Sequence, residues 1–255
     1  MYLRPMEPYG LALLDYLEEG PDSAITISMI RDDGLIERIP VHSFFLKTDD
    51  FSPLEKKALD HCYGSVMDIG AGAGRFSIEL QNRGLTVRAI DVSPKACKVM
   101  EKLGVKDVHC VNILKYGESE NEEKFDTLLL LMKGIGIVEN ITGLDQFLKL
   151  AHKLLNPGGQ ILLDSLDARF SDNPMYLAYH RANQQEGRYG GELRLQYEYK
   201  GKTGPTFRWL LLDRVMLSER SMKQGWDCKF IHKENTGMYL ARLTRLQSET
   251  AEINL

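Results

Sequence analysis

A glycine-rich turn between a short apolar strand and a helix constrains this chain more than any other feature. Val66–Ile69 is predicted to be a buried strand, and it runs into the sequence Asp68-Ile-Gly-Ala-Gly-Ala-Gly74, after which a helix is expected from Arg75. Glycines at these positions permit the turn, let a ligand approach the main chain and let the helix pack closely on the strand. Free N–H groups at the start of such a helix favour electronegative ligand atoms. Glycine-rich turns also occur for purely structural reasons, so the turn alone identifies no ligand.

Strands and helices alternate from this turn as far as Asp164. A second strand is expected at Leu85–Ile90, and the next helix follows Ser93-Pro94 as its cap. Phe125–Met132 reads as a strand that helices cover on both faces. The other elements predicted in this stretch are a strand at Val108–Ile113, a helix capped by Thr142 and a strand at Gln160–Asp164. Such alternation implies right-handed βαβ crossovers and a parallel sheet.

The flanking segments are predicted to form a lid over this core. One hairpin is expected around Asp33-Gly34, and a second, preceded by a helix, turns within residues 201–205. Both segments are too short and too interrupted to be an independent domain. The chain is therefore divided into residues 1–60, an N-terminal helix and hairpin that belong to the lid; 61–165, the ligand-binding core; 166–213, an inserted helix and hairpin that complete the lid; 214–245, a closing helix and strands of the core; and 246–255, a polar tail.

Three details separate the glycine turn from a dinucleotide-binding site. A dinucleotide site carries G-x-G-x-x-G, but counting from Gly70 the third glycine would stand at position 75, where this chain has Arg75. Asp68, two residues before the first glycine, can bind a ligand ammonium group and would repel a pyrophosphate. Asp91 ends the second strand 23 positions after Asp68, which suits a carboxylate that accepts both hydroxyls of a ribose.

With these residues the sequence resembles the class I S-adenosylmethionine-dependent methyltransferases. The motifs that carry the resemblance, between Val66 and Asp164, are Asp68-x-Gly-x-Gly-x-Gly74, Ala89-Ile-Asp91-Val-Ser-Pro94, Asn112-Ile113, Phe125-Asp126 and Leu155-Asn-Pro-Gly-Gly159. The resemblance implies an α/β fold with a doubly wound, mostly parallel sheet of seven strands in the order 3-2-1-4-5-7-6, the last strand antiparallel, and a small lid that covers the substrate. It also implies S-adenosylmethionine as cofactor, S-adenosylhomocysteine as product and in-line methyl transfer.

The same resemblance assigns residues to the cofactor. Asp68 would lie under its methionine end, and Asp91 would hold the ribose hydroxyls, with Val92 against the adenine. The remaining assigned positions are the glycines of the turn, two residues at the adenine edge and two residues after the fourth strand, namely Gly70, Gly72, Gly74, Asn112, Ile113, Leu131 and Met132. The structural alternative for the two aspartates is a helix cap or a surface carboxylate.

Candidates on the acceptor side follow from residue type and position. Lys133 would face the acceptor after the fourth strand, and Asp164-Ser165, at the end of the fifth strand, faces the cleft by topology. Eight of the 22 aromatic residues lie in residues 166–213, where they either bind a planar or cationic acceptor or pack the lid. The candidates from this and other stretches are Tyr176, Tyr179 and Trp209 for acceptor binding and His42, Tyr179 and His180 for a general base. The Asn/Asp-Pro-Pro-aromatic motif of many base-amino methyltransferases does not follow the fourth strand.

Composition narrows the expected partners. The chain has 32 basic and 36 acidic residues, a net charge of −4, and residues 1–60 hold 12 acidic against 6 basic residues. No nucleic-acid partner is therefore expected. Four cysteines without CxxC spacing predict reduced thiols and no metal site. Neither a membrane span nor an N-terminal leader is expected, and a cytoplasmic enzyme with a small-molecule acceptor is favoured.

Other functions stay open at the level of sequence. A nicotinamide oxidoreductase uses a similar sheet, although the spacing at Arg75 argues against it. A non-catalytic cofactor-binding protein, or a methyltransferase that acts on nucleic acid or protein, is harder to separate, because methyl transfer from a sulfonium needs little beyond alignment. The sequence predicts neither the acceptor nor the oligomeric state.

Overall fold

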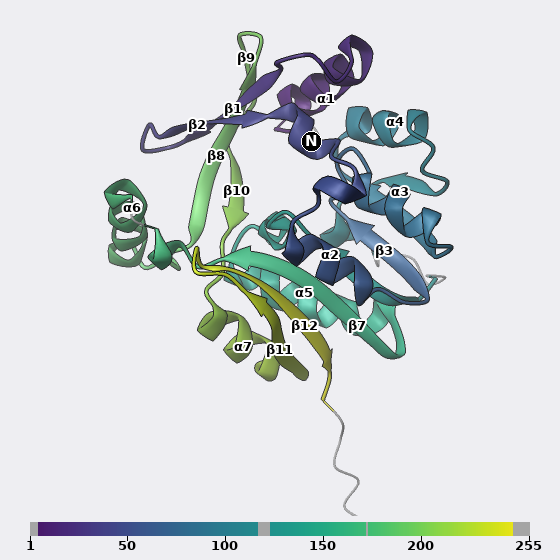
Figure 1. Cartoon of the computed structure of the whole chain (residues 1–255). Coiled ribbons are helices and arrows are strands. Elements are labelled where there is room, and N and C mark those ends of the chain that lie inside the picture. Colours follow the sequence, from purple (N-terminus) through teal and green to yellow (C-terminus); the bar gives the residue numbers. More distant parts are fainter. Residues whose placement is uncertain (1–4, 117–122, 172, 247–255) are drawn as a thin grey trace, which may run out of the picture.

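The computed structural model describes residues 5–116, 123–171 and 173–246, and two β-sheets organise them (Figure 1). The larger sheet has the strand order β11-β12-β7-β6-β3-β4-β5. Its strands are β3 (Ser65–Ile69), β4 (Thr86–Asp91), β5 (Val108–Cys110), β6 (Phe125–Leu130), β7 (Leu155–Leu166), β11 (Trp226–Lys233) and β12 (Met238–Arg245). Neighbours from β5 to β7 are parallel, whereas β12 runs antiparallel to both β7 and β11. The predicted order and the antiparallel last strand are confirmed.

Helices cover both faces of the larger sheet. On one face lie α2 (Pro53–Asp60), α3 (Arg75–Asn82) and α4 (Pro94–Lys102), and on the other lie α5 (Ile141–Leu154) and α7 (Arg214–Lys223). Strand residues alternate between these layers: Leu128 and Leu130 pack with α5, and Leu129 packs with α2 and α3. All three are fully buried. Burial on both faces explains the run of leucines in β6.

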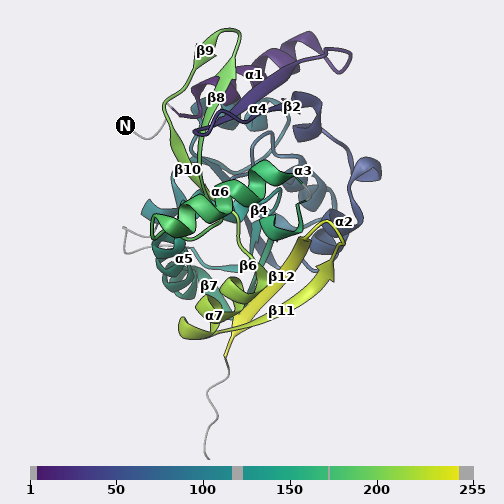
Figure 2. The same ribbon diagram turned by 90° about the vertical axis from the view of Figure 1, so that its left-hand side faces the viewer.

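The second sheet joins two segments that lie far apart in the sequence. Its order is β10-β8-β1-β2 with β9 paired to β8, and all its pairs are antiparallel. Its strands are β1 (Thr26–Arg31), β2 (Ile36–Pro40), β8 (Glu192–Tyr199), β9 (Lys202–Thr203) and β10 (Phe207–Leu210). Helices α1 (Glu7–Glu19) and α6 (Pro174–Gln185) flank it, and Figure 2 shows α1 and β9 at the end of the molecule opposite β11. The two predicted hairpins thus form one sheet through the pairing of β1 with β8.

Two elements begin or end at residues other than the predicted ones, because asparagine side chains cap the helices there. The strand expected to reach residue 113 ends at Cys110, because the Asn112 side chain accepts a main-chain N–H at 2.8 Å and starts the short 3₁₀ helix η3 (Ile113–Lys115). Helix α5 is capped by Asn140 rather than by Thr142, since the Asn140 side chain accepts a main-chain N–H at 2.9 Å. Both corrections reflect a side chain that competes locally for main-chain donors.

Strand β7 begins at Leu155 rather than at residue 160, and its register with β6 is irregular at that end. The predicted polar tail lies, after Leu246, outside the described residues. The other short helices are η1 (Val41–Phe44), η2 (Thr48–Asp50), η4 (Gly134–Val138) and η5 (Ala168–Phe170). In the part of the chain that the structure describes, no helix has the length and apolar character needed to cross a membrane.

Candidate active site

A cavity of about 690 Å³ lies between the ends of the central strands and the second sheet. Its floor is formed at the carboxyl ends of β3, β4, β6 and β7, the edge at which open parallel sheets bind ligands. Its roof is one face of the second sheet, because alternate residues of a strand point the same way. The roof side chains that line the cavity are Met29, Leu193, Leu195, Tyr197, Phe207 and Trp209.

The glycine turn adopts the backbone that its sequence predicts. Gly70, Gly72 and Gly74 have φ angles of +73°, +61° and +80°, which side chains other than glycine rarely adopt. A Cβ on Gly74 would stand 2.8 Å from the Val105 side chain and 2.9 Å from that of Met100, so this glycine serves packing and does not line the cavity. Gly70 and Gly72 do line it.

Asp91 fastens the turn to the end of β4. Its Oδ2 accepts the Gly72 N–H at 3.0 Å, and its Oδ1 accepts the Ser93 N–H at 2.8 Å. Burial raises the pKa of Asp91 to about 6, against the effect of these two donors. The carboxylate also lines the cavity, where it can accept further hydrogen bonds from a ligand.

Asp68 lies beneath the turn and is 2% exposed. Its Oδ2 accepts the Ser77 hydroxyl at 2.6 Å, and burial raises its pKa to about 6. Arg75 lies nearby, paired with Glu55 and stacked on the rings of Phe51 and Phe76. A cationic ligand group at Asp68 would replace the hydration that burial removes.

Asp164 holds an unusual piece of main chain after β6. Met132 and Lys133 have φ angles of 60° and 61°, two consecutive left-handed residues that are not glycine. The Lys133 N–H donates to Asp164 Oδ1 at 2.6 Å. Burial raises the pKa of Asp164 to about 7, and all three residues line the cavity. Strain of this kind persists only where surrounding contacts impose it, and it gathers at functional sites.

Most residues predicted for the site lie on the one cavity. The lining includes Asp68, Gly70, Gly72, Asp91, Val92, Asn112, Ile113, Leu131, Met132, Lys133, Tyr176 and Trp209. The lining therefore fits an adenosyl amino-acid ligand. It offers two buried carboxylates for ammonium and hydroxyl groups, glycines whose main chain a ligand can approach closely, and apolar side chains that can contact a planar base.

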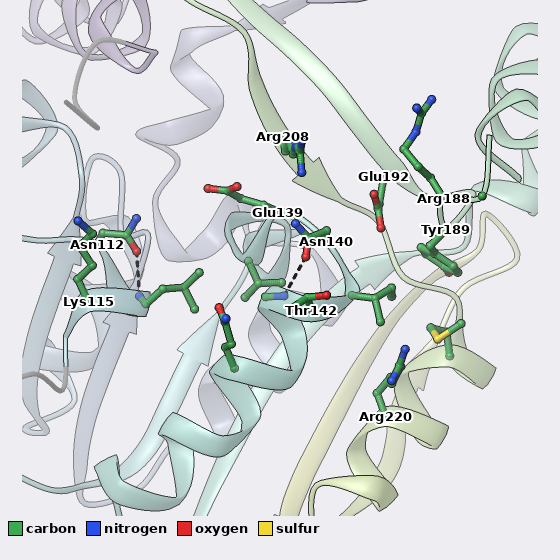
Figure 3. A pocket seen from close by; sticks show the side chains of 17 residues that line it. Asn112, Lys115, Glu139, Asn140, Thr142, Arg188, Tyr189, Glu192, Arg208 and Arg220 are labelled. Atoms are coloured by element: carbon green, nitrogen blue, oxygen red, sulfur yellow. Dashed lines mark hydrogen bonds between the residues drawn. The ribbon is translucent and has the colours of Figure 1, made fainter.

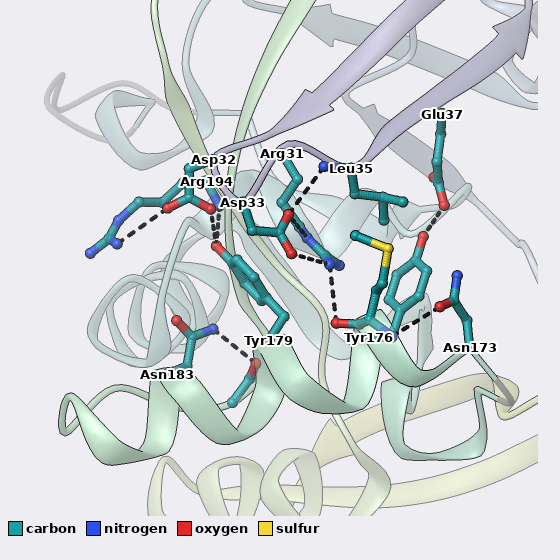
Figure 4. Close-up of polar contacts among 12 residues, drawn as sticks. Arg31, Asp32, Asp33, Leu35, Glu37, Asn173, Tyr176, Tyr179, Asn183 and Arg194 are labelled. Atoms are coloured by element: carbon teal, nitrogen blue, oxygen red, sulfur yellow. Dashed lines mark hydrogen bonds and ion pairs between the residues drawn. The ribbon is translucent and has the colours of Figure 1, made fainter.

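The three candidate bases lie elsewhere, and the structure argues against each of them. His42 is exposed and does not line the cavity. The Tyr179 hydroxyl donates to Asp32 at 2.6 Å and accepts the Arg194 N–H at 3.3 Å, so Tyr179 joins α6 to the second sheet (Figure 4). Tyr179 does not line the cavity, which also argues against its predicted contact with the acceptor. The His180 ring packs over Gly190 outside the cavity.

Sequence reasoning missed Tyr9 of α1 and Glu37 of β2, which line the cavity. Phe44 of η1, considered as a residue that closes over the cofactor, and Tyr197 of β8, one of the lid aromatics, line it too. For β8 a signal was available, since Leu193, Leu195 and Tyr197 alternate with polar residues. Tyr9 has no comparable signal, because its position depends on how α1 packs.

A second, more open depression of about 900 Å³ adjoins the first and shares Asn112, Glu139 and Arg208 with it (Figure 3). The other two arginines that line the second depression form ion pairs, Arg188 with Glu186 and Arg220 with Asp145. Among the described residues, no group of three or more histidine, cysteine, aspartate or glutamate side chains is placed to hold a metal ion.

Comparisons with known proteins agree with this geometry. A family model described as a methyltransferase domain matches residues 67–161. A solved S-adenosylmethionine-dependent methyltransferase from Bacteroides fragilis, in complex with S-adenosyl-L-homocysteine, is 31% identical, with a TM-score of 0.81 over 96% of this chain and 97% of that chain.

More distant relatives have lower sequence identity and are matched over a smaller part of this chain. The ubiquinone biosynthesis O-methyltransferase of Pseudomonas paraeruginosa is 22% identical over 129 residues, 49% of this chain and 56% of the relative. The chain spans between 40% and 56% of the length of the curated relatives it matches. The CcbJ methyltransferase of Streptomyces caelestis is similar in fold, with a TM-score of 0.59 and 12% identity over 78% of this chain and 94% of that chain.

Proposed function

The chain belongs to the S-adenosylmethionine-dependent methyltransferases, and from that premise we propose that it methylates a small, largely apolar acceptor that carries no negative charge. S-adenosylmethionine is its cofactor and methyl transfer its reaction. The observation that carries the proposal is the apolar roof of the 690 Å³ cavity. A cavity of that size falls in the range of small-molecule sites, about 300–1,000 Å³, and cofactor and acceptor must share it.

The floor of the cavity supplies the cofactor half of the proposed site. Asp91 would accept the ribose hydroxyls, and Asp68 the amino-acid ammonium. Val92, Asn112 and Ile113 would lie along the adenine. These roles are supported by the shared lining and by the two buried carboxylates, whose charged forms would be stabilised by ligand donors.

The acceptor half is proposed where the main chain after β6 faces the second sheet. Leu131, Met132 and Lys133 would lie on one side of the acceptor, and the roof residues Leu193 and Trp209 on the other. Seven carboxylates line the cavity against three cations, Arg75, Lys133 and Arg208. That balance favours a cationic cofactor and disfavours an anionic acceptor.

Alignment is the main catalytic demand on this site. When bound, S-adenosylmethionine supplies an electrophilic methyl group on a sulfonium. The apolar roof excludes water, and the turn that Asp164 holds fixes one wall; positioning of this kind is worth on the order of 7–11 kcal/mol in favourable cases. Among the carboxylates that line the cavity, Asp164 has the pKa that is raised furthest, to about 7, which is close to the pKa expected of a general base.

Turnover of methyl-labelled S-adenosylmethionine tests the proposal. The labelled cofactor is incubated with the purified enzyme and a small-metabolite filtrate, which an anion exchanger has divided into anionic and non-anionic pools. We expect label in the non-anionic pool, in a product that partitions into organic solvent. The Asp91→Ala variant is the control: its affinity for S-adenosylhomocysteine should fall about 10- to 100-fold.

Label that enters only the anionic pool would overturn the charge assignment. Label that enters only an RNA or protein fraction would replace the small acceptor by a macromolecule. Cofactor binding without turnover in any fraction would favour a non-catalytic binding protein. We also propose a cytoplasmic location, which the four free thiols support.

A further inference from the structure

Tyr9 reaches the cofactor-binding turn from outside the methyltransferase core. It belongs to α1, well before residues 67–161 that match the methyltransferase domain. A Cβ on Gly72 would stand 2.6 Å from the Tyr9 hydroxyl oxygen. Gly72 donates its N–H to Asp91, so the tyrosine hydroxyl lies over the turn at the point where Asp91 holds it.

Tyr197 brings a second phenol to the same place. Its ring stacks on that of Tyr9, with centroids 5.8 Å apart and planes 25° apart, and Phe44 packs edge-on against Tyr9 at 5.3 Å. Tyr197 lies on β8, and all three rings line the cavity. The pair is therefore fixed by packing from three different elements.

Both hydroxyls are left without a partner. Neither the Tyr9 nor the Tyr197 hydroxyl makes a hydrogen bond to any residue that the structure describes, and both side chains are half-buried at the cavity wall, where a ligand can reach them. Burial, and next the Asp91 carboxylate, raise the pKa of Tyr9 well above its ordinary value, and the same two causes raise that of Tyr197 to about 12. Both phenols therefore stay protonated and can donate.

We infer that Tyr9 and Tyr197 bind the cofactor by donating hydrogen bonds to the ribose oxygens that Asp91 holds from below. A ribose hydroxyl that donates its proton to Asp91 keeps the lone pairs of its own oxygen free to accept. The two phenols would lie on the side of the ribose opposite Asp91, where they can donate to those lone pairs. The second sheet and α1 would then complete the cofactor site as well as cover the acceptor. The inference rests on the methyltransferase assignment and is independent of the acceptor.

Isosteric phenylalanine variants test the inference, because they remove only the hydroxyls. Calorimetry of Tyr9→Phe and Tyr197→Phe with S-adenosylhomocysteine and with adenosine should show binding about 3- to 10-fold weaker in each variant, and for both ligands alike. Tyr63→Phe is the matched control: its hydroxyl donates to Gly158 at 2.6 Å away from the cavity, and its removal should leave both affinities unchanged.

Thermal denaturation without ligand separates binding from folding, and we expect no loss of stability in either cavity variant. Affinities within twofold of the parent would overturn the inference, and weaker binding of S-adenosylhomocysteine with unchanged adenosine binding would overturn the ribose assignment. A parent that binds S-adenosylhomocysteine but methylates no small molecule would instead count against the proposed acceptor alone.

Discussion

At the scale of single residues, the site is built around carboxylates that burial has made weaker acids. The pKa rises to about 6 at Asp68 and Asp91 and to about 7 at Asp164. Because each folded-state pKa exceeds the unfolded value, the folded protein binds protons more tightly between pH 4 and 7. These three groups therefore favour folding at low pH and lose that contribution as the pH rises through 6 to 7.

The ligand-free enzyme should accordingly be more stable at pH 5.5 than at pH 8. Asp164 alone accounts for on the order of 2 kcal/mol over that interval. Urea unfolding at both pH values measures the difference, and Asp164→Asn, which keeps an acceptor for the Lys133 N–H, should reduce it. A parent that is less stable at pH 5.5 would contradict the raised pKa values.

Gly72 is the residue at which backbone and ligand requirements coincide. Gly72→Ala should lower the free energy of unfolding by about 1–2 kcal/mol, because alanine disfavours the left-handed φ of +61°. The added methyl group would also press against the Tyr9 hydroxyl, so S-adenosylhomocysteine binding should weaken strongly. Gly84→Ala is the control, because Gly84 has a φ of +85° but nothing within 4 Å of an added Cβ. Calorimetry and urea unfolding should show a backbone cost in both variants and a binding loss only at Gly72. Equal affinities in the two variants would refute the close approach.

Sequence analysis correctly placed on the cavity most residues whose position a motif dictates, and of those chosen by residue type it placed Tyr176 and Trp209 but not His42, Tyr179 or His180. Asp68, Gly72 and Asp91 lie at fixed steps from a strand end, so chain order places them. His42 and Tyr179 were chosen for their chemistry, and nothing local ties either side chain to a cavity formed by distant segments. The Tyr179 hydroxyl instead attaches α6 to Asp32, in the turn that follows β1.

At the scale of elements, a buried guanidinium and two tyrosine hydroxyls attach α6 to the second sheet (Figure 4). Arg31, at the end of β1, pairs with Asp33 at 2.7 Å, donates to the Met175 carbonyl at 3.2 Å and lies over the rings of Tyr176 and Tyr179. Its side chain is 3% exposed. A charge buried in this way is costly to leave unpaired, so the hairpin and the helix are held in one arrangement.

Replacement of Arg31 should loosen α6 locally. In Arg31→Ala, hydrogen exchange followed by mass spectrometry should be at least about tenfold faster across α6, with α3 unchanged, because the contacts of the guanidinium with Met175, Tyr176 and Tyr179 are lost together. Arg83→Ala is the control, since it removes ion pairs to Asp60 and Glu79 from a more exposed arginine. Unchanged exchange in α6 would show that apolar packing alone attaches it.

The order of elements was predictable because each has its own periodicity and cap. Their exact ends were not, where two capping residues compete: Asn140 rather than Thr142 starts α5, and Asn112 ends β5 early. The pairing of β1 with β8 has no local signal, since residues 32–191 separate the two strands in the sequence.

At the scale of the whole molecule, the second sheet shares an apolar cluster with the cofactor-binding core. One apolar cluster combines Leu13 of α1 with Ile27 of β1, Ala73 of the glycine turn, Val99 of α4 and Tyr199 of β8. Since the cofactor turn and the covering sheet share this cluster, the two parts of the molecule should fold and unfold together.

The two tryptophans make that coupling measurable, because Trp209 lies in the second sheet and Trp226 in the larger one. In each single-tryptophan version, made with Trp226→Phe or Trp209→Phe, the urea transitions followed by fluorescence and by far-ultraviolet circular dichroism should coincide. Leu13 is fully buried, so Leu13→Ala should lower the stability that both tryptophans report by the same amount, about 2–5 kcal/mol. Leu246→Ala, at a residue 49% exposed, should change it by less than about 0.5 kcal/mol. If the Trp209 signal instead unfolds first, the second sheet is a separate cooperative unit, and α1 then positions Tyr9 only while that unit is folded.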